Sequence, residues 1–449
     1  MTLARLLAET ALRSPNRPAL AHDGRRLTYA ELNVLAARAA GGLLARGVAA
    51  GDTVAFILPN RPESVAAYHG ALRLGATVVP LNPLLSKPEV AARVADAGAH
   101  LFDVDDLDGP SADLPPVPDG DDVAVILYTS GTTGDPKRIE LTHAGLRLSI
   151  DYLAFVGLGL REDDVVFGAA PLAHVLGMSG CMNATIAAGA CLALVPRFEA
   201  RSALELMERE GVTILLGVPS MCAALLAASA ETRPAPGLRI AHVGGAPVPV
   251  ELLHTFEERF GAIVLEGYGM TECGGTATLN HAGRERKPGS VGTPASGGVI
   301  SIAEDGEVLL RSPTLLRGHD GWFPTGDVGR IDDDGYLYLL DRKKDVILRG
   351  GYTVYPREVE EVLFAHPDVH EAVVLGVPSE LHGEEVVALV VAGPDGCDAD
   401  ELKAFVREQV AAYKYPRLVL VVDELPHGPS GKIQRREIDR LALASLLTS

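Results

Sequence analysis

Short apolar runs alternate with helical patterns along the first 265 residues of the chain. The runs lie at residues 53–58, 77–80, 123–127, 165–168, 191–195, 212–216, 240–243 and 263–265, and helical stretches such as 203–210, 220–230 and 250–260 separate several of them. Runs of this length indicate buried strands. Buried strands that alternate with helices form largely parallel sheets covered by helices. The pattern therefore predicts an α/β fold for this part of the chain, with α/β subdomains at about 1–121 and 122–265.

The pattern changes after residue 265. Between residues 299 and 340, the segments GEVLLRS and GYLYLLD read as strand, turn and strand, which predicts a small antiparallel β layer within a β-rich part at about 266–340. From residue 346 a separate α+β unit follows, with strands at 384–391 and 418–422 and a helix after Asp398 that starts like a capping box. We expect a large N-terminal domain, residues 1–340, and a smaller C-terminal domain, residues 346–449.

Composition narrows the class of protein. A chain of 449 residues is too long for one compact core and is expected to form at least two domains. The net charge of −19 argues against nucleic acid and anionic membranes as partners. The five cysteines show no metal-like spacing, which indicates reduced thiols, and no signal core or apolar membrane span is visible. The sequence therefore predicts a cytoplasmic protein without a membrane span.

The segment YTSGTTGDPKR, residues 128–138, carries the first candidate chemistry. It follows an apolar strand directly, and its glycines and hydroxyls precede Lys137. Small residues let backbone N–H groups approach phosphate oxygens, and the lysine adds a positive charge. The spacing differs from that of the P-loop of NTPases. Taken alone, the segment fits a phosphate cradle and a flexible linker equally well.

Three later segments contain groups that suit a nucleotide. GYGMTE, residues 267–272, offers the flat ring of Tyr268 to a base and the carboxylate of Glu272 to Mg²⁺. GWFPTGD, residues 321–327, ends with Asp327, whose carboxylate can accept hydrogen bonds from both hydroxyls of a ribose. PSGKIQRRE, residues 429–437, places Lys432 in a glycine-flanked loop. Each segment alone is more often a polar turn or a solvated tail.

The four segments, in this order, resemble the motifs of the superfamily of adenylate-forming enzymes, which contains acyl-CoA synthetases, adenylation domains and luciferases. PLAHVLG, VGGAP and DRKKDVILRGGYTVYPREVE also resemble its motifs, and the likeness extends from LTYAELN, residues 27–33, to Lys432. Within the superfamily, the chain most resembles fatty-acid or aryl acyl-CoA ligases. The resemblance implies that ATP activates a carboxylic acid as acyl-AMP with release of pyrophosphate, and that the acyl group then passes to coenzyme A. ATP, Mg²⁺ and coenzyme A are the cofactors that it implies.

The resemblance also assigns roles to individual residues. The catalytic residues that it implies are Lys432, Glu272, Thr271 and His174. The residues that it places against ATP are Thr129, Ser130, Gly131, Thr132, Thr133, Gly134, Lys137, Gly244, Gly245, Ala246, Tyr268, Gly269, Met270, Thr271, Asp327, Arg342 and Lys432, and Thr129 and Glu272 would hold Mg²⁺. The acyl pocket that it implies is lined by His174, Met178, Val218, Gly244 and Gly267.

In the superfamily, the C-terminal domain is mobile and acts twice. It closes with the lysine that matches Lys432 for adenylation and then rotates so that another face lines the thiol tunnel. The resemblance therefore implies a hinge at residues 341–345 with Lys344 as the hinge residue, and a coenzyme A tunnel beside Gly350 and Gly351. Glycines suit a narrow passage because they have no side chain and a wide range of backbone conformations.

Arg138 departs from the family pattern, which has glycine at this position. A left-handed backbone there would make the arginine cost roughly 1 kcal/mol. Two alternatives stay open for its side chain. It contacts the triphosphate, or it points to solvent or pairs with Glu140.

Residues that are absent from the motifs limit which acid the protein can activate and which acceptor receives the acyl group. The segment PLAHVLGM has no aspartate, which argues against an α-amino acid, and Gly267 stands where malonate-type ligases often have arginine, which disfavours a dicarboxylate. An apolar monocarboxylic acid, fatty or aryl, remains. Because no carrier domain follows before Ser449, free coenzyme A is the expected acceptor. An acyl carrier protein as the partner, or a degenerate member that binds nucleotide without turnover, are the alternatives.

Overall fold

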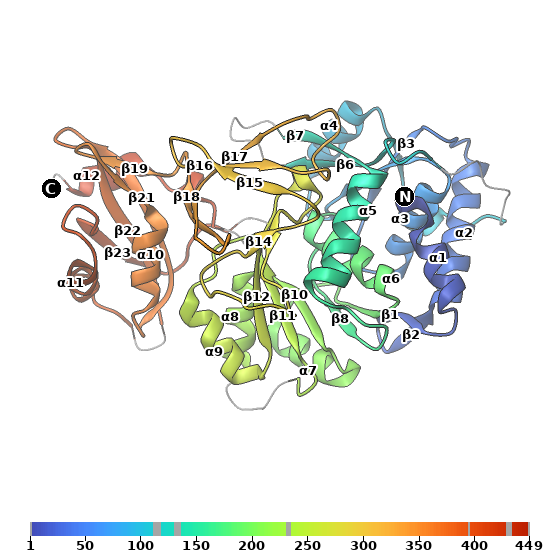
Figure 1. The fold of residues 1–449 in the computed structure, drawn as a ribbon, viewed down its shortest axis with the longest axis horizontal. Coiled ribbons are helices and arrows are strands. Elements are labelled where there is room, and N and C mark those ends of the chain that lie inside the picture. The colour runs from blue at the N-terminus through green and yellow to red at the C-terminus, as the bar shows by residue number, and fades with distance from the viewer. Residues whose placement is uncertain are drawn as a thin grey trace.

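The computed structural model describes residues 2–110, 118–129, 136–229, 235–393, 396–427 and 433–447. Figure 1 shows a large N-terminal part, coloured blue to yellow, beside a smaller C-terminal part in orange and red. The N-terminal part contains a five-stranded, a nine-stranded and a four-stranded sheet, and the C-terminal part contains a second five-stranded sheet. This architecture confirms the predicted α/β fold with a smaller C-terminal α+β unit.

The first five-stranded sheet has the strand order β5-β3-β4-β6-β7. Its strands are β3 (Thr53–Ile57), β4 (Thr77–Leu81), β5 (His100–Phe102), β6 (Val123–Thr129) and β7 (Lys137–Thr142). Its helices include α2 (Tyr29–Ala45), α3 (Pro62–Arg73) and α4 (Lys87–Ala97). β3 to β6 pair in parallel, whereas β7 turns back antiparallel to β6. Thr28 and Glu31 form a capping box that starts α2, so the chain enters this helix at a defined residue.

The nine-stranded sheet has the order β14-β13-β12-β11-β10-β8-β9-β1-β2. Its strands are β1 (Pro18–His22), β2 (Arg25–Thr28), β8 (Val165–Gly168), β9 (Cys191–Leu194), β10 (Ile214–Gly217), β11 (Ile240–Gly244), β12 (Ile263–Tyr268), β13 (Thr278–Leu279) and β14 (Thr293–Pro294). β8 to β12 pair in parallel, as their apolar runs predict. Sheet membership crosses residue 121, because β1 and β2 belong here while β6 and β7 belong to the first sheet. The subdomain boundary at about residue 121 therefore stays a prediction.

Alternate residues of the parallel strands face two different cores. Leu215, Ala241 and Val243 pack into a cluster with residues of α7 (Ala200–Glu210), α8 (Pro219–Ala228) and α9 (Val250–Phe260). Leu216 and Leu265 belong to the larger cluster on the other face, which includes residues of α5 (His143–Asp151) and η4 (Leu176–Asn183). This alternation is the period-two pattern of a strand that is buried on both faces.

The four-stranded sheet is antiparallel and confirms the predicted β layer. Its strands are β15 (Val299–Ile302), β16 (Glu307–Arg311), β17 (Phe323–Ile331) and β18 (Leu337–Arg342), which pair in this order. The chain then enters the C-terminal part directly from β18. The last strand of the N-terminal part therefore leads straight into the second unit.

The C-terminal sheet has the order β20-β19-β22-β21, and β23 pairs with β22. Its strands are β19 (Ile347–Arg349), β20 (Tyr352–Val354), β21 (Val369–Ser379), β22 (Gly383–Ala392) and β23 (Leu418–Val422), and its helices are α10 (Pro356–Phe364), α11 (Ala399–Gln409) and α12 (Arg440–Leu447). The Asp398 side chain accepts hydrogen bonds from the amides of Asp400 and Glu401, which is the N-cap half of the predicted capping box. None of the helices in the described ranges combines the length and the apolar composition that a membrane span needs.

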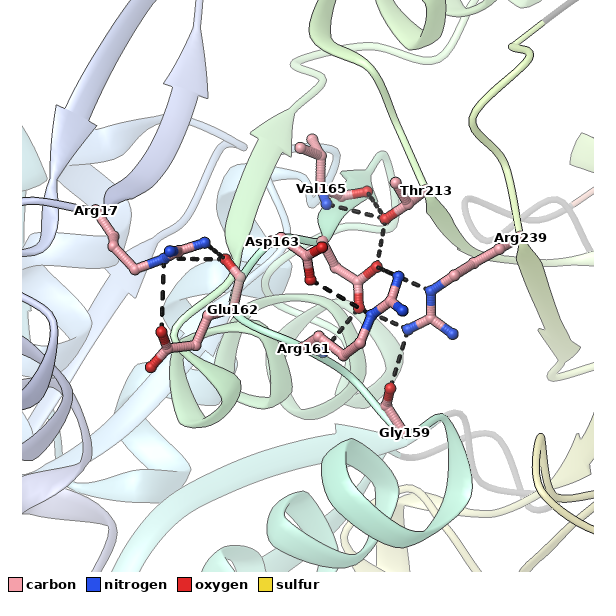
Figure 2. Close-up of polar contacts among 9 residues, drawn as sticks. Arg17, Gly159, Arg161, Glu162, Asp163, Val165, Thr213 and Arg239 are labelled. Atoms are coloured by element: carbon pink, nitrogen blue, oxygen red, sulfur yellow. Dashed lines mark hydrogen bonds and ion pairs between the residues drawn. The ribbon is translucent and has the colours of Figure 1, made fainter.

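A buried carboxylate holds the amino ends of three parallel strands together, in the region that Figure 2 shows. Arg239 donates to both carboxylate oxygens of Asp164, at 2.9 and 2.6 Å, and the Thr213 hydroxyl donates to one of them at 2.7 Å. The Arg161 amide donates to the other at 2.8 Å. Burial raises the pKa of Asp164, but these hydrogen bonds outweigh it and leave the pKa below its usual value. Because the network lies at the amino ends, the carboxyl ends remain for a ligand.

Candidate active site

Two predicted motifs meet at the carboxyl ends of β11 and β12. VGGAP begins within β11 and GYGMTE begins within β12, and these parallel strands pair with Gly244 opposite Gly267. The backbones are so close that a β-carbon on Gly244 would lie 2.9 Å from the Gly267 carbonyl oxygen. A β-carbon on Gly269 would lie 1.9 Å from the Gly275 carbonyl oxygen. Glycine is therefore required here for close backbone packing, whatever ligand binds beside it.

Asp327, Arg342 and Tyr268 form a connected group between the nine-stranded and the four-stranded sheets. Asp327 on β17 and Arg342 on β18 are cross-strand partners, and Arg342 Nε lies 2.8 Å from Asp327 Oδ1. The Tyr268 hydroxyl donates a hydrogen bond to Asp327 Oδ2. Burial and the Asp327 charge raise the pKa of Tyr268 well above its usual value, so the phenol stays protonated and keeps donating.

The geometry of this group suits a ribose and a base. Asp327 is buried, while Arg342 is exposed. A carboxylate has about four lone-pair positions and can accept several hydrogen bonds at once, which suits the two hydroxyls of a ribose. The structure thus brings together three of the residues that the resemblance places against ATP. Their contact with the nucleotide stays a prediction.

The β6–β7 hairpin brings Thr129 opposite Lys137. The described residues do not include Ser130, Gly131, Thr132, Thr133 and Gly134. Contacts of these five residues with phosphate therefore stay predictions. β7 packs against η5 (Thr271–Cys273), which carries Thr271 and Glu272. The segment after β16 joins these elements, because the Leu316 amide donates to the Glu272 carbonyl at 2.7 Å and the Arg317 amide to the Glu140 carbonyl at 2.9 Å.

This neighbourhood fits the predicted magnesium ion. The hydroxyl of Thr129 and the carboxylate of Glu272 are hard oxygen ligands, and both side chains are half-buried rather than enclosed. Mg²⁺ commonly binds through one or two carboxylates together with substrate phosphates. The residues present therefore fit an ion that arrives with a nucleotide.

Arg138 takes the second of its two predicted arrangements. Its Nη2 lies 2.7 Å from Glu140 Oε1, and its Nη1 donates to the Asp96 carbonyl at 2.9 Å. The residue lies within β7 opposite Tyr128 and has no positive φ, so the left-handed backbone that we considered is wrong. An extended strand accepts arginine without the strain that a left-handed residue would store. Arg138 therefore binds to protein groups of β7 and α4.

The predicted acyl-pocket residues follow the carboxyl ends of neighbouring parallel strands. Val218 follows β10, and His174 lies between β8 and η4. Met178 lies within η4, which packs on β8 and β10. Met178 is fully buried, whereas His174 is exposed, and its Nδ1 accepts a 3.4 Å hydrogen bond from the Leu176 amide. With Gly244 and Gly267 on β11 and β12, these residues share one edge of the sheet. The lining of a pocket by them stays a prediction.

His242 lies beside this group, although none of the sequence motifs contains it. It lies in the middle of β11 and is buried, and its Nδ1 is 3.1 Å from the Leu265 carbonyl oxygen. Burial lowers the pKa of His242 to about 4, so the ring is neutral at pH 7. The only signal in the sequence is one polar residue inside the apolar run at 240–243, which is also typical of a structural histidine.

Comparison with known families decides the identity. Residues 7–110 and 101–319 match the family described as AMP-binding enzyme, and residues 358–432 match the AMP-binding enzyme C-terminal domain. The chain belongs to the AMP-binding enzyme family. The resemblance to adenylate-forming enzymes that the motifs indicate is thereby confirmed.

Relatives of this AMP-binding enzyme match it along nearly its whole length. A feruloyl-CoA synthase from an Amycolatopsis species is 36% identical, and the alignment covers 95% of this chain and 96% of that protein. A long-chain-fatty-acid–CoA ligase from Bacillus subtilis is 30% identical, with 97% and 94% covered. The crystal structure of the anthranilate CoA ligase AuaEII in complex with anthranoyl-AMP superposes with a TM-score of 0.92 at 27% identity, and covers 99% of this chain and 98% of that one.

The C-terminal motif of this AMP-binding enzyme contains two tight turns. Lys344 is exposed in the turn after β18, where the Asp345 amide donates to the Arg342 carbonyl at 2.9 Å. Gly350 and Gly351 join β19 to β20 with φ of +55° and +84°, as a two-residue hairpin of type I′ requires. Their glycine identity thus has a backbone reason, and the predicted hinge and coenzyme A tunnel stay predictions. Lys432 lies outside the described residues.

Proposed function

We propose that this member of the AMP-binding enzyme family is an ATP-dependent carboxylate–CoA ligase. It activates an apolar monocarboxylic acid, fatty or aryl, as acyl-AMP with release of pyrophosphate, and then transfers the acyl group to coenzyme A. The Asp327–Arg342 pair, held by Tyr268 at the carboxyl ends of the parallel strands, is the observation that carries the proposal. The relatives named above support it, because they are CoA ligases that align with this chain from end to end.

In this proposal, different residues bind different parts of the substrates during adenylation. Asp327 accepts hydrogen bonds from the two ribose hydroxyls, and Arg342 holds its carboxylate in place. Thr129 and Lys137, at the end of the β6–β7 hairpin, bind the triphosphate, and Glu272 is the carboxylate for Mg²⁺. Bound Mg²⁺ neutralises phosphate charge that would repel the incoming carboxylate. Lys432 binds the oxygens where negative charge develops during transfer.

The nature of the pocket favours an acid with an apolar tail. Met178 and Val218 are buried apolar residues, and Gly267 presents no cation to a second carboxylate. A carboxylate buried without a partner costs several kcal/mol even after relaxation. Benzoates, cinnamates or octanoate are therefore better substrates than malonate.

Coenzyme A is the acceptor in this proposal, and the protein acts in the cytoplasm. Loading of a separate acyl carrier protein remains the alternative for the second step. The presence of Lys432 and Glu272, which act in catalysis and in Mg²⁺ binding in this proposal, argues against a degenerate member that binds nucleotide without turnover.

A pyrophosphate-release assay tests the proposal. The protein is incubated with MgATP and a panel of benzoate, cinnamate, octanoate and malonate, with and without coenzyme A. Acid-dependent pyrophosphate together with an acyl-CoA product is the expected result. Pyrophosphate without acyl-CoA indicates a carrier protein as the acceptor. Absence of pyrophosphate with every acid, or malonate as the best substrate by kcat/KM, contradicts the proposal.

A further inference from the structure

His242 faces the side of the sheet where the acyl-pocket residues lie. Its strand neighbours Ala241 and Val243 pack into the cluster of α7, α8 and α9, so the alternation of β11 turns His242 to the opposite face. On that face its register partners are Leu216 and Leu265, and both belong to the cluster that contains Met178. A polar ring therefore stands in an otherwise apolar layer at the predicted pocket.

The tautomer of His242 follows from its one hydrogen bond. Its Nδ1 lies 3.1 Å from the Leu265 carbonyl oxygen, and a carbonyl oxygen only accepts, so Nδ1 carries the proton. Because the ring is neutral, Nε2 has a lone pair and acts as an acceptor. Among the described residues, no group donates a hydrogen bond to Nε2. Both ring nitrogens of His69 are unpaired and fully buried, whereas Nε2 of His242 is unpaired but not fully buried. Nε2 is therefore not completely enclosed by protein atoms.

The edge of the ring that carries Nε2 lies over Gly267. A β-carbon on Gly267 would be 2.4 Å from His242 Cε1 and 3.1 Å from Nε2. The imidazole therefore fills the position that a side chain of residue 267 would take. His242 stands two residues before Gly244 on the same face of β11, so it lies about 6–7 Å deeper than the strand end, at roughly 3.3 Å per residue.

We propose that His242 is a specificity-determining residue that accepts a hydrogen bond from a hydroxyl or amino group on the tail of an aryl acid. This inference rests on the proposed function, in which the acid lies against Gly244 and Gly267. The carboxylate is at the carboxyl ends of the strands, the aromatic ring crosses the two glycines, and the polar substituent meets Nε2. A hydroxylated or aminated aryl acid satisfies this acceptor, whereas an unsubstituted aryl acid or an alkyl chain leaves it unpaired, which costs binding free energy.

The preference for a hydroxylated or aminated aryl acid can be measured with pairs of matched acids. The kcat/KM of pyrophosphate release is compared within pairs that differ by one donor, such as cinnamate and 4-hydroxycinnamate, or benzoate and its hydroxy- and aminobenzoates. In the unmodified enzyme, at least one substituted acid exceeds its parent by about 10- to 100-fold. His242→Leu lowers this ratio to within about threefold, because kcat/KM falls more for the substituted acid than for its parent. His242→Gln, which retains a donor and an acceptor, keeps part of the preference.

The controls separate this inference from the proposed function. His69→Leu removes another buried histidine, on α3, and leaves the ratio unchanged. Should His242→Leu also lose turnover of the parent acid, His242→Met provides the same comparison with an unbranched apolar side chain. An unaltered ratio in the Leu or Met variant, or the absence of any substituent preference in an enzyme that turns over aryl acids, overturns the role of His242. Failure to release pyrophosphate with any acid contradicts the proposed function instead.

Discussion

Arg342 Nε lies 2.8 Å from Asp327 Oδ1, and the two residues are paired across β17 and β18. Asp327 Oδ2 accepts a hydrogen bond from the Tyr268 hydroxyl on a different sheet. The carboxylate is therefore held from two directions before any nucleotide binds. Such preorganisation reduces the entropy that the protein loses when a ligand binds.

Asp327→Asn is expected to lower kcat/KM for ATP by about 100-fold, because charge-assisted hydrogen bonds to two hydroxyls are replaced by weaker ones. ATP–pyrophosphate exchange at saturating acid measures the effect. Tyr268→Phe is the matched control, since it removes one hydrogen bond to Asp327 and keeps the aromatic ring. We expect a loss of less than about tenfold for this variant. Equal kcat/KM for Asp327→Asn and the unmodified protein would exclude a ribose-binding role.

Lys432→Ala is expected to lower the rate of adenylation by about 10²–10³, while thioester formation from supplied acyl-AMP is largely retained. The reason is that Lys432 would contact the reacting oxygens only in the state that forms acyl-AMP. The two half-reactions are measured separately, by pyrophosphate release and by acyl-CoA formation from synthetic acyl-AMP. An equal loss in both would show that the C-terminal part does not act in two different states.

Arg138→Gly is expected to leave the KM for MgATP unchanged, since Arg138 pairs with Glu140 and the Asp96 carbonyl. Lys137→Ala is the comparison on the adjacent residue, and we expect it to raise the KM for MgATP several-fold, with a smaller effect at high salt where charges are screened. Initial rates at fixed acid and varied MgATP give both constants. A several-fold rise in KM for Arg138→Gly would place this arginine in the phosphate site.

Asp164→Asn is expected to lower the free energy of unfolding by about 3 kcal/mol, because Arg239 is left beside a neutral partner in a mostly buried network. Asp163→Asn is the control at the next residue, where an exposed carboxylate lies 3.4 Å from Arg161, and should change the free energy by less than about 1 kcal/mol. Urea denaturation at pH 7 measures both. The pKa of Asp164 is lowered in the folded protein, so its contribution is present above the unfolded pKa of about 3.9 and is lost as the pH falls further. Similar losses in the two variants would contradict this account.

Glu266→Gln is expected to stabilise the protein at pH 8 and to have little effect at pH 4. Burial raises the pKa of Glu266 to about 7, although the Gly289 amide donates to its carboxylate at 3.0 Å. A raised folded pKa means that stability is present below the unfolded value of 4.5 and is lost as the pH rises through about 7. The gain at pH 8 is on the order of 3 kcal/mol, because a tenfold change in proton affinity corresponds to about 1.4 kcal/mol. Urea denaturation at both pH values checks the difference, and an equal effect at both would refute it.

Patterns along the chain are enough to predict the secondary-structure elements and the family. The apolar runs at 240–243 and 263–265 correspond to β11 and β12, and the ordered motifs indicate the chemistry. These features are local. A strand that is buried on both faces shows as a short apolar run, and a tight turn shows as one or two glycines, so a few neighbouring residues are enough to predict either.

Which residues come into contact depends on how the elements pack in three dimensions. β1 pairs in parallel with β9, with Leu20 opposite Leu192, and Arg138 reaches Asp96. The position of His242 over Gly267 depends on the register between β11 and β12 and on the face that each residue takes. Sheet order and register arise from the packing of the whole core, so no pattern within one element encodes them, and a change of one residue in register would turn His242 away from Gly267.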